Sequence, residues 1–192
     1  MRQIRYGVFE TNSSSMHSIV VTKDDKPVEH IEQGYGLNDI YLNSEGKYCV
    51  GGCDSKVDFE RYPFEVLYSP AGRARYAIAS YAYNVDIEDK VEEIESIIRS
   101  VMPEFKGFEF DKYTYWDTDE EEIHYGHVDH QSSGLLQNFL SERNVSLRDF
   151  ILNDKYWVII DGDEYCLTND YLDNKVLNKD YIVEVFNDGI TW

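Results

Sequence analysis

The stretch DIEDKVEEIESIIRSVM, residues 86–102, carries the clearest structural signal in the chain. Its apolar residues recur with the period of an α-helix that buries one face. These positions are Ile87, Val91, Ile94, Ile98 and Val101, and the acidic residues expected on the outer face are Glu92, Glu93 and Glu95. Asp86 can cap the first turn and Pro103 can end the helix, so the stretch predicts one amphipathic helix.

Three further helices are expected on either side of this stretch. A shorter helix precedes it, with Ser69 as the cap, Pro70 in the first turn and residues 73–83 in the body. Two more follow, one over residues 134–142 and one over residues 146–153 that is capped by its first residue, a serine. The middle of the chain is therefore predicted to be mainly helical.

Strand signals dominate both ends of the chain. Residues 156–161 and 164–168 are β-rich runs joined through an Asp-Gly pair, which is the favoured turn chemistry of a hairpin. Further strands are expected at residues 4–9, 16–22 and 181–186. This order predicts an α+β fold with an antiparallel or mixed sheet and about four helices packed on it, in a single acidic domain over residues 1–192.

The composition limits the classes of partner. Hydrophobic residues make up 42% of the 192 residues and aromatic residues 15%, which is enough to build a packed core. The formal net charge of -19 repels nucleic acid and anionic membranes, and it attracts cations and basic protein surfaces. We therefore expect no direct nucleic-acid partner and no membrane partner. The same charge also fits a purely solubilising role.

The cysteines and the N-terminal residues favour a cytoplasmic protein. Cys49, Cys53 and Cys166 are odd in number, and the spacing of the first two matches neither a redox motif nor the usual zinc knuckle. We expect them to be small buried thiols. The chain shows no apolar signal-peptide core and no apolar run long enough to span a membrane.

The first polar segment is TNSSSMHS at residues 11–18. Short polar side chains of this kind form turns, which we expect at residues 12–14. If a strand begins near Ser15, then Ser15 and His17 share one face with the apolar Ile19. A partly buried imidazole beside hydroxyls can act as a general base or as a metal ligand. The alternative is a serine-rich turn that caps backbone groups, with His17 simply hydrogen-bonded.

The second polar segment is HYGHVDHQSS at residues 124–133, which holds three of the five histidines. His127, Asp129 and His130 are candidate metal ligands, although on a regular strand they do not all point the same way. A bend at Gly126 would be needed to bring more of the segment onto one ion. The alternatives are ordinary exposed histidines and serines that cap the helix that follows.

Folding can join the two segments into one polar pocket. His17 would be the base and His130, oriented by Asp129, the acid, since two histidines in different environments make a natural acid–base pair. The residues predicted to be catalytic are His17, His130, Asp129 and Ser15. The residues predicted to bind the ligand are Arg5, Asn12, Ser13, Ser14, Gln131 and Ser132.

The strings RYGVFETNSSSMHS and GHVDHQSS together resemble a group of uncharacterised bacterial and phage proteins. Members of that group open with an Arg-containing strand and an F-E-T-N-S-S-S-x-H-S motif, and they carry a V/I-D-H-Q-S element later in the chain. The resemblance covers about two dozen residues and implies no activity. It directs attention to a common set of residues, namely Arg5, Glu10, Asn12, Ser13, Ser14, Ser15, His17, Asp129, His130, Gln131 and Ser132.

Two functions of different classes fit these features, and the residues leave open whether the protein is an enzyme. The first is the binding or processing of a phosphate-containing small ligand or nucleotide, with or without a divalent metal, because hydroxyls, backbone N–H groups and Arg5 can hold an anion. The alternative is a non-catalytic acidic inhibitor or decoy that covers the basic surface of a nucleic-acid-handling protein. The net charge and the acidic run at residues 117–122 suggest it. A complex of that kind should weaken steeply as salt rises. A structural or virion accessory role has no sequence feature of its own.

Overall fold

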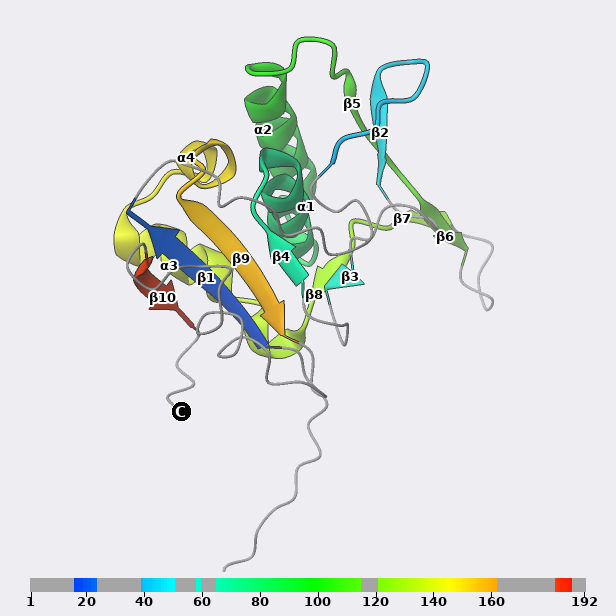
Figure 1. The fold of residues 1–192 in the computed structure, drawn as a ribbon. Coiled ribbons are helices and arrows are strands. Elements are labelled where there is room, and N and C mark those ends of the chain that lie inside the picture. Colours follow the sequence, from blue (N-terminus) through cyan, green and yellow to red (C-terminus); the bar gives the residue numbers. More distant parts are fainter. Residues whose placement is uncertain are drawn as a thin grey trace, which may run out of the picture.

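A four-stranded antiparallel sheet with the strand order β10-β1-β9-β4 is the largest sheet of the fold (Figure 1). The computed structural model describes residues 16–23, 39–50, 58–59, 65–114, 121–161 and 182–187. The four strands are β1 at Met16–Thr22, β4 at Glu65–Leu67, β9 at Tyr156–Asp161 and β10 at Ile182–Phe186. The predictions for β1 and β9 are confirmed, and so is that for β10 over the residues described, Tyr181 lying outside them. The strands expected at residues 4–9 and 164–168 lie outside the described residues.

Both faces of this sheet are buried at its centre. One face contributes Ile19, Val158 and Ile160 to the main core, and the opposite face contributes Val20, Trp157 and Ile159 to a second cluster. These six residues are at most 1% exposed. Alternation of side chains along a strand explains the division, and burial on both faces explains why β9 is continuously apolar.

Four α-helices lie between β4 and β9 in the described chain, two before and two after a run of short strands, and they complete an α+β fold, as predicted. They are α1 at Pro70–Tyr81, α2 at Ile87–Arg99, α3 at Leu135–Arg143 and α4 at Leu147–Leu152. α1 contacts both α2 and α4, while α3 contacts β1. Figure 1 shows α1 and α2 side by side behind the β4 edge of the sheet. Within the described residues, no helix combines the length and the apolar character that crossing a membrane requires.

Two of the predicted helix caps are confirmed. The Ser69 hydroxyl accepts a hydrogen bond from the Gly72 N–H at 3.1 Å, and the Ser146 hydroxyl accepts one from the Asp149 N–H at 3.0 Å. Asp86 holds the N-cap position of α2 without a side-chain capping bond. Each cap satisfies a backbone donor that the helix itself leaves open, which contributes about 1 kcal/mol.

Helix α2 ends at Arg99, three residues before the end expected from its pattern. The Ser100 N–H already bonds to the carbonyls of both Ser96 and Ile97 at 3.2 Å, which tightens the last turn. Val101 therefore leaves the buried face and is 57% exposed. Glu95 also differs from the expected outer position, because its carboxylate accepts the Phe108 N–H at 2.8 Å.

Helix α1 is buried along its length. Small residues, Ala71, Gly72, Ala74, Ala77 and Ala79, let neighbouring elements approach it closely. Arg73 is fully buried, and it donates to the carbonyls of Ile151 at 2.9 Å and Tyr156 at 2.8 Å. Desolvation lowers the pKa of Arg73 to about 10, so the guanidinium stays charged at neutral pH and ties α1 to α4 and β9.

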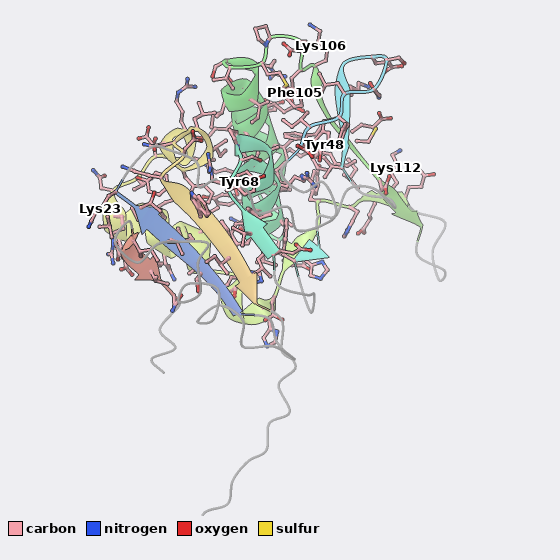
Figure 2. All side chains as sticks on the ribbon, viewed as in Figure 1. Lys23, Tyr48, Tyr68, Phe105, Lys106 and Lys112 are labelled. Atoms are coloured by element: carbon pink, nitrogen blue, oxygen red, sulfur yellow. The ribbon has the colours of Figure 1, made fainter. Side chains whose placement is uncertain are left out.

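Three small strand pairs surround the helices. Strand β2 at Lys47–Val50 runs parallel to β5 at Gly107–Phe110, and β3 at Asp58–Phe59 runs parallel to β8 at His127–Val128. Strand β6 at Lys112–Thr114 pairs antiparallel with β7 at Glu121–Ile123, away from the main sheet (Figure 1). Lys112, labelled in Figure 2, joins this pair through an ion pair with Glu121 at 3.0 Å.

The expectation of buried thiols is wrong for Cys49. Its side chain is exposed on β2, because it takes the solvent side of a strand whose alternate residues Tyr48 and Val50 are buried. Cys53 and Cys166 lie outside the described residues.

Candidate functional site

The two polar segments of the sequence meet at β1. This strand contacts η1, a 3-10 turn at His130–Ser132 that belongs to the second segment. From the first segment, His17 lies in β1 and is described with its side chain. The predicted site residues that fall outside the described part of the chain are Arg5, Asn12, Ser13, Ser14 and Ser15. Gln131 lies in η1, and its side chain is not described.

His17 lies in the core. The residue is 2% exposed, and its Nδ1 lies 3.0 Å from the hydroxyl oxygen of Tyr76 on α1. A hydrogen bond also joins the ring to the backbone of Phe59 on β3. Burial lowers the pKa of His17 to about 3, and the bond with Phe59 acts in the opposite direction. At neutral pH the imidazole is therefore uncharged, and it links β1 to α1 and β3.

Phe59 connects the two segments. Its carbonyl accepts the Asp129 N–H at 3.0 Å, and its backbone also bonds to His17. Its ring lies edge-on to the Tyr76 ring, with the centroids 5.5 Å apart. Residues far apart in the chain are thus joined around one short strand pair, β3 and β8. These contacts link His17 to His130 through Phe59 and Asp129.

Asp129 and His130 form the part of this arrangement that reaches solvent. The Asp129 side chain is 6% exposed and the His130 side chain 79%, and Asp129 Oδ1 lies 3.4 Å from His130 Nδ1. The turn is fixed by the Ser132 N–H, which donates to the Asp129 carbonyl at 2.8 Å, and by the Ser133 hydroxyl, which donates to the His130 carbonyl at 3.0 Å. Ser132 itself is buried.

This geometry suits proton transfer or anion binding at His130. A carboxylate oxygen lies beside Nδ1, and the exposed ring is within reach of a solute. The neutral His17 cannot supply charge to the site. The predicted roles of His130 as acid and of His17 as base stay predictions.

The predicted metal ligands His127, Asp129 and His130 do not gather into a ligand set. Among the residues that the structure describes, no group of three or more His, Cys, Asp or Glu side chains could hold a metal ion. The His127 ring lies instead near the His124 ring, with the centroids 6.4 Å apart.

Sequence reasoning missed two buried charged residues near His17, Glu65 and Arg75. His17 and Glu65 both pair in register with Ile160, one from each side, so the three lie in a row across the sheet. Glu65 is 6% exposed and lies close enough to the fully buried Arg75 of α1 to raise its pKa, against the larger lowering by desolvation. The Arg75 guanidinium lies over the Tyr48 ring of β2, with its central carbon 5.2 Å from the ring centroid.

The sequence did hold a signal for the buried Arg75. It is the run AGRARYAIAS, residues 71–80, where arginines stand among small apolar residues of an otherwise apolar helix. A helix that is apolar all round is usually buried, and its arginines then need partners inside the protein.

Comparison with known proteins identifies no relative of this chain. No protein-family model matches the chain, and neither a curated protein nor a solved structure does. The functional argument therefore depends on the side chains described above.

Proposed function

We propose that the protein binds, and processes, a phosphate-containing small ligand or nucleotide at the turn that carries Asp129 and His130. The observation that carries the proposal is an exposed imidazole beside a buried carboxylate, at 79% and 6% side-chain exposure. A protonated imidazole donates to phosphate oxygens, and an ordered one does so at a lower entropic cost.

The neighbouring groups support an anion more than a neutral ligand. The Ser133 hydroxyl is exposed beside His130, and the hydroxyl-rich segment at residues 11–15 precedes the strand that contacts η1. Arg5, Asn12, Ser13, Ser14 and Gln131 complete the proposed ligand contacts. No metal enters the proposal.

The charge of the whole protein gives the proposal a distinctive salt dependence. A net charge of -19 repels an anionic ligand over distances comparable with the Debye length. Added salt screens that repulsion, so the affinity for phosphate should rise as NaCl is increased from low to moderate concentration. Binding to a basic protein surface would show the opposite trend.

The test is isothermal titration calorimetry with inorganic phosphate and with AMP, on wild type, His130→Ala and His124→Ala. The two variants remove the same side chain from the same segment, and His124 lies outside η1. His130→Ala should weaken binding about tenfold or more, equivalent to about 1.4 kcal/mol, while His124→Ala should bind like wild type.

Turnover is followed as phosphate release from p-nitrophenyl phosphate and from AMP. Loss of release in His130→Ala, with binding by His124→Ala retained, supports processing at His130. Wild-type protein that binds neither phosphate nor AMP, or a His130→Ala variant with unchanged affinity and turnover, would overturn the proposal.

A further inference from the structure

The turn between α1 and α2 presents two apolar side chains fully to solvent. Val85 is 107% exposed and Tyr83 is 82% exposed, the highest values among the large hydrophobic residues of the described chain. A single exposed apolar residue on a protein surface is ordinary. Here two of them stand two residues apart in one short turn, and we call this pair the Tyr83–Val85 knob.

The backbone of this turn is fixed. The Asn84 N–H donates to the Tyr81 carbonyl at 2.9 Å, and the Ile87 N–H donates to the Asn84 carbonyl at 3.2 Å. Tyr81 is buried beneath the turn, and the Lys90 ammonium lies 5.4 Å from its ring centroid. A knob held in this way loses little conformational entropy on docking, so more of its burial contributes to affinity.

Acidic residues follow the knob along α2. The exposed acids of the next two helical turns are Asp86, Glu88, Asp89, Glu92 and Glu93. Lys90, the one basic residue among residues 83–93, is paired with Glu93 at 2.8 Å. The surface therefore combines an apolar anchor with a strongly negative border.

Helix stability explains only part of this pattern. Acids in the first turn of α2, Glu88 and Asp89, favour the helix dipole. That effect fades beyond the first turn, and the pair with Lys90 accounts for Glu93, but neither explains Glu92 or gives a reason for exposing Tyr83 and Val85. Charge of one sign around an apolar centre is instead the anatomy of a recognition surface.

We propose that the Tyr83–Val85 knob and the exposed acidic face of α2 form a docking surface for a basic amphipathic protein segment. Apolar side chains of the partner bury Tyr83 and Val85, and its lysine and arginine side chains meet the acids of α2. Nucleic acid and anionic membranes are excluded as occupants by the sign of the charge. The surface uses none of the residues assigned to the site at His130.

The probe is a fluorescein-labelled amphipathic helical peptide built from lysine and leucine, and binding is measured by fluorescence anisotropy. The knob variant is Tyr83→Ser with Val85→Ser. Its matched control is Tyr41→Ser with Val101→Ser, which removes the same residue types from positions that are 70% and 57% exposed. The knob variant should bind the peptide about tenfold more weakly, and the control should stay within about twofold of wild type.

A second pair of variants tests the charge. Glu92→Gln with Glu93→Gln is compared with Glu121→Gln with Glu122→Gln on β7, and each pair breaks one lysine–glutamate contact. The α2 pair should reduce both the affinity and its salt dependence more than the β7 pair does. All substituted side chains are on exposed residues, so circular dichroism should show unchanged folding.

Equal weakening by the knob variant and its control, or by the two charge pairs, would overturn the proposal, because it would identify the binding as unspecific attraction to an acidic protein. Equal binding of a peptide in which serine replaces leucine would also overturn it, since the knob would then contribute nothing.

Discussion

The two histidines of the candidate site lie on either side of the Phe59–Asp129 connection in opposite environments. His17 is 2% exposed, and burial holds its pKa at about 3, whereas the His130 side chain is 79% exposed beside a buried carboxylate. The same side chain is therefore an uncharged packing and hydrogen-bonding group at one position and a solvent-accessible group beside a carboxylate at the other. Environment, and not residue type, assigns the chemistry.

Acidification should have the largest effect on the free energy of unfolding, and it should act through the buried His17. The folded pKa of His17 lies below its ordinary value of 6.5, so between pH 6.5 and about 3 the unfolded chain binds a proton that the folded chain does not. This contribution to the free energy of unfolding is complete above pH 6.5 and is lost as the pH falls toward 3. The full loss is on the order of 5 kcal/mol.

Urea denaturation at a series of pH values measures this contribution in wild type, His17→Gln and His130→Gln. The many carboxylates titrate alike in all three proteins, so they cancel in the differences. The stability gap between wild type and His17→Gln should narrow as the pH falls, while His130→Gln should follow wild type. If the free energies of unfolding of wild type and His17→Gln change with pH in parallel, the lowered pKa of His17 is contradicted.

The next largest effect should come from truncating the two histidines at neutral pH, because the buried one and the exposed one should differ in how much stability is lost. His17→Ala leaves a cavity and removes the partner of the Tyr76 hydroxyl, so the free energy of unfolding should fall by about 3 kcal/mol. His130→Ala removes an exposed side chain and should change it by less than about 0.5 kcal/mol. Urea denaturation compares the two, and a similar loss in both variants would contradict the division into a buried and an exposed half.

Local signals explain why much of the fold could be predicted. The hydroxyls of Ser69 and Ser146 cap their helices as expected, and the apolar run at β9 forms the centre of the sheet. The parallel pairs β2–β5 and β3–β8 were not predicted, because they join short strands across long stretches of chain. Strand pairing at that separation leaves no trace in local periodicity.

The site was predictable as two segments but not as an arrangement. The alternation of β1 correctly put His17 on the same face as Ile19, which is a property of neighbouring residues. Its hydrogen bonds to Tyr76 and Phe59 come from residues more than forty positions away, one on α1 and the other on β3, and only the tertiary fold brings them to β1. The burial of Arg75 likewise depends on distant partners.

Removal of the Tyr76 hydroxyl beside His17 should lower the free energy of unfolding by less than truncation of His17 does. Tyr76→Phe keeps the ring that packs against Phe59 and removes the hydroxyl group 3.0 Å from His17 Nδ1. The free energy of unfolding should fall by about 1 kcal/mol. Tyr83→Phe, at an 82% exposed tyrosine, is the matched control and should leave stability unchanged. Equal stability of both variants would show that the Tyr76–His17 bond contributes nothing.

The smallest effect on stability is expected at Ser133, and the Ser133→Ala variant gives the sharpest test of the function of the exposed His130. Ser133→Ala removes an exposed hydroxyl that donates to the His130 carbonyl at 3.0 Å, so it should lower the free energy of unfolding by less than about 0.5 kcal/mol. If the turn binds phosphate, the same variant should weaken phosphate binding about threefold, because the hydroxyl and the orientation of His130 both serve the ligand. Tyr76→Phe should do the reverse, lowering stability while leaving phosphate affinity unchanged in calorimetric titrations. A Tyr76→Phe variant that loses as much phosphate affinity as Ser133→Ala would mean that the buried imidazole is part of the binding site, and the division between the two histidines would then fail.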